Sequence, residues 1–181
     1  NQHDFKKRVE RLNLKHSNNA DVMWMNARLE TSQMNYDRAI DQLNKLKKEV
    51  TNSQVILDLA INIWRSGNKQ AAISELENLI RDNDRDSRAL MLLAQYYKQN
   101  NQQEKSRSAY RKLEVLLPNQ PVVLNNLAWS LIDVSPQEGL QFAVRASELL
   151  PENPMILDTL GGLYLASGDK EKALQVFIQA A

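Results

Sequence analysis

The chain has 181 residues, of which 43% are hydrophobic and 25% are charged, and its formal net charge is +1. A charge so close to zero gives no general attraction to nucleic acid or anionic lipid. There is no cysteine, which excludes disulfide bonds, thiol catalysis and zinc sites built on thiolates. No apolar run approaches the length of about eighteen residues that a membrane-spanning helix needs, and the polar start NQHDFKKRVERL is not a signal peptide.

Small residues recur along the chain at a nearly constant interval. The steps are 33 or 34 residues in the series Ala27, Ala60, Ala94, Ala128 and Gly161. A second series with the same steps lies twelve residues or so after the first: Ala39, Ala72, Ser106, Gly139 and Ala173. Such a period is typical of repeat proteins built from helix pairs, and small residues let two helix axes approach closely. We therefore predict an all-α protein, an α-solenoid of stacked antiparallel helix pairs.

The period divides the chain into one solenoid of five two-helix units, residues 20–52, 53–86, 87–120, 121–152 and 153–181. Residues 1–19 are predicted to be the second helix of a truncated unit. Turn residues agree with this division, since Ser66-Gly67-Asn68-Lys69 returns as Ser167-Gly168-Asp169-Lys170. Asn153 before Pro154 and the box Ser135-Pro136-Gln137-Glu138 predict helix starts. The stretch VLNNLAWSLI, residues 123–132, reads as a helix.

The last unit carries its apolar and small residues at Leu157, Leu160, Gly161, Tyr164, Ala173, Phe177 and Ala180. This pattern resembles the tetratricopeptide repeat, and the resemblance covers essentially the whole chain. The first unit departs most, with Asn26 and Glu30 where the family has Leu and Tyr. The resemblance implies a right-handed superhelix whose first helices line a concave groove for a protein or peptide partner.

On this resemblance, one side of each first helix supplies the groove. The expected groove residues are Trp24, Arg28, Leu57, Asp58, Ile61, Trp64, Arg65, Arg88, Met91, Gln95, Lys98, Asn125, Asn126, Trp129, Asp158 and Thr159. All three tryptophans of the chain fall on this side, and tryptophan is enriched at binding hot spots. The alternative is that a groove-side tryptophan fills a gap between units, and for Trp64 the two interpretations are equally favoured. Asn125 and Asn126 can bond a peptide backbone or simply water.

Several function classes find no support. The only histidines, His3 and His16, are far from the groove carboxylates, and no HExxH, phosphate loop or nucleophile elbow occurs. We expect a non-enzymatic protein without cofactor or metal. The groove charges balance, which argues against RNA. The Lys/Asn clamp with which some members of the family hold a terminal carboxylate is absent, because the equivalent positions are Trp24, Leu57, Met91, Asn125 and Asp158.

The last two units also resemble the repeats of bacterial lipoproteins linked to PEP-CTERM and exosortase systems. They share Asn125, Asn126, Trp129, Pro151, Pro154, Asp158 and Thr159, but Gly162 replaces a second tryptophan. This resemblance implies a periplasmic or cell-envelope protein that organises export or exopolysaccharide machinery.

Three uses of the groove remain open on the sequence. The first is capture of a protein segment, extended or helical. The second is self-association, in which apolar ends without a polar capping helix stack end to end. The third is a polysaccharide-binding accessory role that uses the same aromatic surface. Neither nucleic acid nor direct membrane contact is expected.

Overall fold

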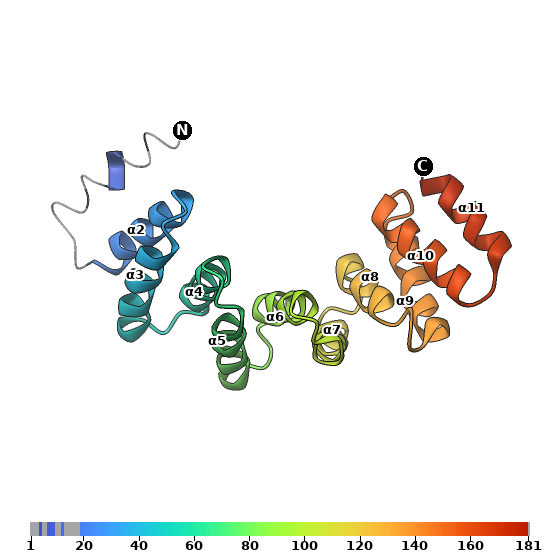
Figure 1. Ribbon diagram of the computed structural model, residues 1–181, viewed down its shortest axis with the longest axis horizontal. Coiled ribbons are helices and arrows are strands. Elements are labelled where there is room, and N and C mark those ends of the chain that lie inside the picture. Colours follow the sequence, from blue (N-terminus) through green and yellow to red (C-terminus); the bar gives the residue numbers. More distant parts are fainter. Residues whose placement is uncertain (1–3, 5–6, 10–11, 13–18, 181) are drawn as a thin grey trace. The chain divides into compact units, whose positions relative to one another are not determined.

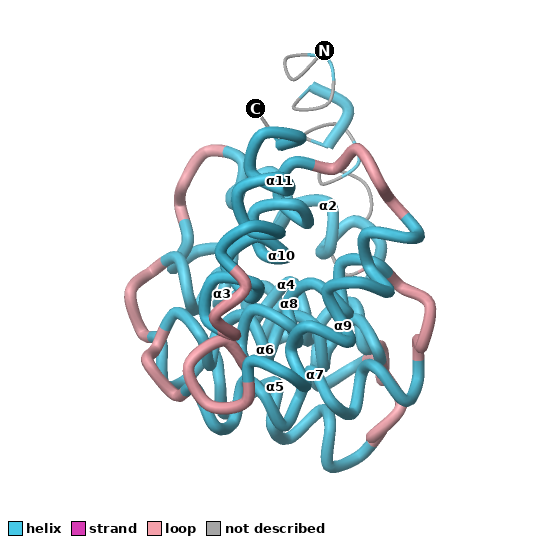
Figure 2. The backbone as a smooth tube through the Cα atoms, turned by 90° about the vertical axis from the view of Figure 1, so that its right-hand side faces the viewer, coloured by secondary structure: helices cyan, strands magenta, loops and turns pink. Residues whose placement is uncertain are grey.

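The computed structural model describes residues 4, 7–9, 12 and 19–180. Within these residues helices alternate with short loops and there is no strand (Figure 2). The helices from α2 onward follow one another in chain order (Figure 1): α2 (Ala20–Ser32), α3 (Tyr36–Glu49), α4 (Ser53–Arg65), α5 (Lys69–Asp82), α6 (Ser87–Gln99), α7 (Gln103–Leu116), α8 (Pro121–Ser130), α9 (Pro136–Leu149), α10 (Pro154–Ala166) and α11 (Lys170–Ala180). The prediction for residues 1–19 lies mostly outside the described residues.

Consecutive helices pack in pairs. Helix α2 packs on α3, α4 on α5, α8 on α9 and α10 on α11, while the hydroxyl of Ser106 in α7 donates to the carbonyl of Ala94 in α6 at 2.9 Å. The predicted all-α fold of helical hairpins is confirmed. The chain forms two compact units, residues 1–89 and 90–181, whose boundary falls in the first turn of α6.

The core of the first unit is shared between hairpins. Ala27 of α2 and Leu43 and Leu46 of α3 form one buried cluster with Val55 and Leu59 of α4. The first hairpin therefore buries its apolar stripe only because the next hairpin covers it, as expected for a repeat protein.

The second unit repeats this arrangement. Ala128 of α8 and Ala143 of α9 form a buried cluster with Leu160 and Leu163 of α10. Here too a hairpin is closed by the first helix of the hairpin that follows it.

Small residues mark the points of closest helix approach. A Cβ added at Gly139 would lie 2.8 Å from Leu163 Cδ2 and 3.0 Å from the carbonyl oxygen of Ala128. A Cβ at Gly161 would lie 2.6 Å from Cε1 of Phe177. Contacts this short would force a neighbour to shift, so Gly139 lets α9 approach α8 and α10 closely, and Gly161 makes room for the Phe177 ring of α11.

Four of the five described first helices start at the same kind of cap, a side-chain oxygen that accepts backbone N–H groups of the first turn. The capping residues are Asn19, Asn52, Asp86 and Asn153. The fourth hairpin has Gln120 at this position without a cap bond, followed by Pro121. The predicted box at Ser135 is wrong in its first half, since the Ser135 side chain caps no backbone N–H.

Four of the turns inside the hairpins contain one residue in the left-handed backbone conformation, with positive φ. Gly67 and Gly168 have φ of +98° and +89°, whereas Met34 and Asn101 reach +62° and +58° without being glycine. The fourth hairpin, one residue shorter between its helices, has no such residue. Its first helix α8 ends at Ser130, so the expected helix through Ile132 stops two residues early in a run of turns.

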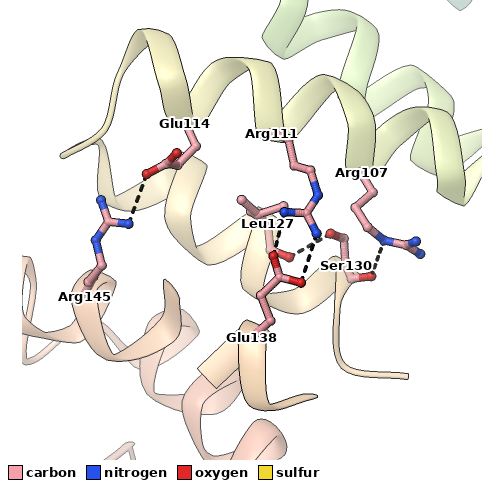
Figure 3. A network of polar contacts seen from close by, with 7 residues as sticks. All are labelled: Arg107, Arg111, Glu114, Leu127, Ser130, Glu138 and Arg145. Atoms are coloured by element: carbon pink, nitrogen blue, oxygen red, sulfur yellow. Dashed lines mark hydrogen bonds and ion pairs between the residues drawn. The ribbon is translucent and has the colours of Figure 1, made fainter. Parts of the chain in front are cut away.

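Side-chain bonds on the second helices join the third and fourth hairpins (Figure 3). Arg111 of α7 holds Glu138 of α9 through bonds of 2.6 and 3.0 Å, and this bond keeps the pKa of Glu138 below its ordinary value. Arg145 bonds Glu114 at 3.0 Å and the carbonyl of Pro118 at 2.7 Å. Exposed ion pairs contribute little each, so these contacts add only modestly to the packing of the two hairpins.

Candidate functional site

All the predicted groove residues lie on the first helices of the hairpins. Those from Trp24 to Arg88 belong to the first unit and those from Met91 to Thr159 to the second. The first unit therefore carries its set on α2, α4 and the first turn of α6, and the second unit carries its set on the rest of α6, α8 and α10.

In the first unit the structure connects three of these side chains, Trp24, Asp58 and Arg88, through Gln54 in one series of hydrogen bonds. The indole Nε1 of Trp24 donates to Asp58 Oδ2 at 2.7 Å, and Gln54 Nε2 donates to Asp58 Oδ1 at 2.9 Å. Arg88 Nη1 in turn donates to Gln54 Oε1 at 3.0 Å. Two of these bonds join residues that are 34 positions apart, which is one repeat period. The series of hydrogen bonds therefore links the first helices of three consecutive hairpins.

Trp24 has a packing role as well as a polar one. Its ring is half-buried and packs against the core cluster of Ala27, Leu43 and Leu59. The guanidinium carbon of Arg28, one helical turn later, lies 5.7 Å from the ring centroid, which is a cation–π contact. The interpretation of Trp24 as a filler between hairpins therefore holds for much of its surface.

A pocket of about 310 Å³ lies beside this series of hydrogen bonds, between α2 and α4. Its wall is apolar at Ala27, Leu43 and Ile61, and its polar lining is Arg28, Thr31, Ser32, Asp58, Asn62 and Arg65. Thr31 Oγ1 lies 2.9 Å from the Ala27 carbonyl and 2.8 Å from Asn62 Oδ1, and Asn62 Nδ2 donates to the Asp58 carbonyl at 2.8 Å.

Asn62 is the residue of this pocket that the sequence reasoning missed. It is only 2% exposed and is flanked by Ile61 and Ile63. A polar residue between two isoleucines on a helix is a usable signal, because a buried amide needs partners. Here those partners come from both hairpins.

In the second unit the distinctive feature is Trp129 of α8. It is 41% exposed, the most open of the three tryptophans. Lys98 of α6 places its Nζ 3.7 Å from the ring centroid, and desolvation lowers the pKa of this ammonium. The side chain of Trp64, in the first unit, is half-buried, with Lys69 Nζ at 5.5 Å from its ring centroid.

Beside Trp129 the surface is partly polar and partly open. The Oδ1 atom of Asn125, one turn before Trp129, is enclosed and has no hydrogen-bond partner among the described residues. On the neighbouring α10, a Cβ at Gly162 would meet only Ile132 Cδ1, at 3.3 Å. Asp158 of the same helix is exposed, while Met91, Gln95 and Asn126 are half-buried.

Two predicted groove residues lie in the core instead. Leu57 and Thr159 are each 5% exposed, and the Thr159 hydroxyl bonds the carbonyl of Met155 in its own helix at 3.0 Å. Their assignment to an accessible surface is corrected.

Within the described part of the chain, no group of three or more His, Asp or Glu side chains is placed to hold a metal ion. Among the same residues, no helix is both long and apolar enough to cross a bilayer.

Comparison with protein families decides the class of these hairpins. A family model described as "Tetratricopeptide repeat" matches residues 55–181. The chain belongs to the tetratricopeptide repeat family. The match begins within α4 and takes in every helix after it, so it includes α6, α8 and α10, which carry the second unit's predicted groove residues.

Solved structures with the same tetratricopeptide fold include several of the protein MamA. MamA from residue 41 onward of Desulfovibrio magneticus RS-1 has a TM-score of 0.79 at 14% identity, covering 89% of this chain and 92% of that one. An RS-1 MamA double mutant gives 0.80 at 13% identity with the same coverage. MamA of MSR-1 gives 0.72 at 19% identity, covering 89% and 94%. TM-scores of this size establish the shared fold, and at such low identities they establish the fold alone. No curated protein matches the chain by sequence.

Proposed function

We propose that this tetratricopeptide protein is a non-catalytic scaffold that binds a protein segment on the first-helix faces of its repeats. The observation that carries the proposal is Trp129. An indole that is 41% exposed on a first helix, with Lys98 stacked on one side, is the kind of rigid, amphipathic anchor that dominates interfaces.

The surroundings of Trp129 support a peptide ligand. Gly162 on α10 leaves the neighbouring repeat without a side chain at that point, which gives a backbone room to approach. Asn126 and the amide nitrogen of Asn125 offer hydrogen bonds of the type an extended chain can use. In the first unit, Asp58 and its partners Trp24 and Gln54 supply the corresponding polar surface.

Selection from a phage-displayed library of random peptides tests the proposal. Peptides should be enriched on the wild-type protein, and Trp129→Ala should weaken their binding by about 2 kcal/mol, as hot-spot truncations do. The matched control is Val115→Ala, because Val115 is 78% exposed on the second helix α7 and should leave binding unchanged. Failure to enrich any peptide, or equal losses from the two variants, would contradict the proposal.

A more specific proposal is a role in a bacterial export or exopolysaccharide system. It rests on the amino-acid sequence of the last two repeats, including Asn125, Trp129 and Asp158. A sugar ligand would stack on the exposed face of Trp129. Titration with oligosaccharides, followed by the fluorescence of this indole, tests that alternative. A peptide that binds where no sugar does would favour the protein partner.

Self-association is a second candidate, supported by the last helix. Leu174 and Ile178 of α11 are 62% and 68% exposed. They stand 34 residues after Leu140 and Val144, which pack against a cluster containing Leu160 and Leu163 of the next hairpin. Another hairpin, from a second copy, would cover the same positions on α11. Sedimentation equilibrium should then show dimers that Leu174→Glu dissociates, and a wild-type monomer at high concentration would refute this candidate.

A further inference from the structure

The pocket between α2 and α4 has an unbalanced charge. Arg28 of α2 and Arg65 of α4 both line it and are both exposed. Among the described residues neither guanidinium forms an ion pair, and the recorded contact of Arg28 is its stacking on Trp24. Two cationic groups from adjacent repeats therefore face one pocket without an anionic partner.

The acidic residue of the pocket, Asp58, offsets only one of the two positive charges and forms no ion pair with either arginine. Its two carboxylate oxygens accept separate hydrogen bonds, one from the Trp24 indole at 2.7 Å and one from the Gln54 amide at 2.9 Å. These bonds orient the carboxylate of Asp58 along the first-helix face. The groove charges balance when they are counted along the sequence, but in the folded unit this pocket keeps a net charge of +1, from two arginines and one aspartate.

We propose that this pocket binds the side-chain carboxylate of an aspartate or glutamate in the partner segment, between Arg28 and Arg65. The inference rests on the proposed function, because it assigns the carboxylate to a bound protein segment. Planar guanidinium groups match carboxylate geometry. The apolar wall at Ile61 and Ala27 suits the methylene groups that carry such a carboxylate, which an inorganic anion lacks.

The charged groups around the pocket do not cancel its preference for a carboxylate. A neighbouring pocket of about 580 Å³ shares Arg65 and is also lined by Asp37 and Arg38, whose opposite charges offset each other. Thr31 and Asn62 form the polar floor and are already bonded to each other and to backbone carbonyls. The arginines thus remain the groups that select the ligand.

An NMR titration tests the inference without the natural partner. The probe is N-acetylglutamate amide, whose side chain is anionic, and its neutral match is N-acetylglutamine amide. The glutamate probe should shift the Nε–H signals of Arg28 and Arg65, with at most a weak response to the glutamine probe. Arg28→Gln and Arg65→Gln should each weaken the apparent affinity about twofold to fivefold, the range of exposed ion pairs. Inorganic phosphate should bind more weakly than the glutamate probe.

The matched control is Arg81→Gln, since Arg81 is an exposed arginine of α5 outside the pocket. It should leave the titration unchanged. Equal shifts with both probes, no shift at either arginine, an equal loss in Arg81→Gln, or phosphate binding as tightly as glutamate would each overturn the inference. Circular dichroism of the variants excludes unfolding as the cause of a loss.

Failure of the carboxylate site can be distinguished from failure of the proposed scaffold function. Library peptides whose binding depends on Trp129, together with no selective glutamate response at Arg28 and Arg65 in the NMR titration, would overturn the carboxylate site and leave the scaffold proposal standing. A selective glutamate response with no peptide enrichment would overturn the scaffold proposal and leave the carboxylate pocket standing.

Discussion

The two adjacent glycines of α10 should respond with opposite sign to the same change, to alanine. Alanine stabilises a helix interior by about 0.8–1.0 kcal/mol relative to glycine, and this gain applies equally at Gly161 and Gly162. At Gly161, however, the new Cβ would lie 2.6, 2.8 and 2.9 Å from three ring atoms of Phe177. Overpacking of this kind costs about 1–3 kcal/mol.

The net expectation for Gly161→Ala is a loss of stability of up to about 2 kcal/mol. At Gly162 the new Cβ meets one terminal methyl, Ile132 Cδ1, at 3.3 Å, which a small rotation relieves. Gly162→Ala should therefore raise the free energy of unfolding by about 0.5–1 kcal/mol. The helix-propensity gain cancels in the difference between the variants, which isolates the clash with Phe177.

Urea denaturation followed by circular dichroism measures both free energies of unfolding. A second test combines Gly161→Ala with Phe177→Leu, which removes the ring and should make the alanine less costly than it is alone, a coupling that a double-mutant cycle detects. The reasoning is refuted if the two glycine variants differ by less than about 0.5 kcal/mol, the usual limit of additivity, or if Gly162→Ala is the less stable one.

Three further outcomes are expected. Met34→Gly should stabilise the protein by about 0.5–1 kcal/mol in the same assay, because an exposed methionine at φ +62° carries about 1–2 kcal/mol of strain that outweighs the extra chain entropy of glycine; a destabilised variant would contradict this. Leu127→Ala removes a fully buried side chain and should cost about 2–5 kcal/mol, whereas Trp129→Ala should cost under about 1 kcal/mol, and similar losses would show that Trp129 belongs to the core. In a variant whose other tryptophans are phenylalanine, the fluorescence emission of Trp129 should change as Lys98 loses its proton below pH 10.5, because desolvation disfavours the ammonium and lowers its pKa. A transition midpoint at or above pH 10.5, or a transition that persists in Lys98→Met, would exclude the pairing of Lys98 with Trp129.

Much of the fold is predictable because its determinants are local and periodic. The series through Ala60 and Ala72 locates helix pairs, since close helix approach requires a small residue once per repeat. The turn glycines Gly67 and Gly168 have the left-handed backbone that their equivalent positions predict. Met34 occupies the same conformation without a sequence signal, because the hairpin around it imposes that geometry on a residue which disfavours it.

The candidate site is less predictable than the fold. The period places Trp24 and Asp58 on first helices, but a period of 34 residues does not reveal that the indole of one donates to the carboxylate of the other. Nor does it separate Leu57, which is buried, from Asp58 beside it, which is half-buried. The angle at which one hairpin packs on the next decides which flank of a first helix is covered.

The sequence by itself determined that the chain is a stack of helical hairpins, where each hairpin turns, and which helices carry the tryptophans. Only the tertiary structure decided that Asp58 is already bonded by Trp24 and Gln54, that Arg28 and Arg65 share a pocket without an ion-pair partner, and that Trp129 is the most exposed indole. Helical hairpins follow from spacings within about one repeat, whereas hydrogen bonds and burial between repeats depend on distances of a few ångströms across helices that the spacing leaves undetermined.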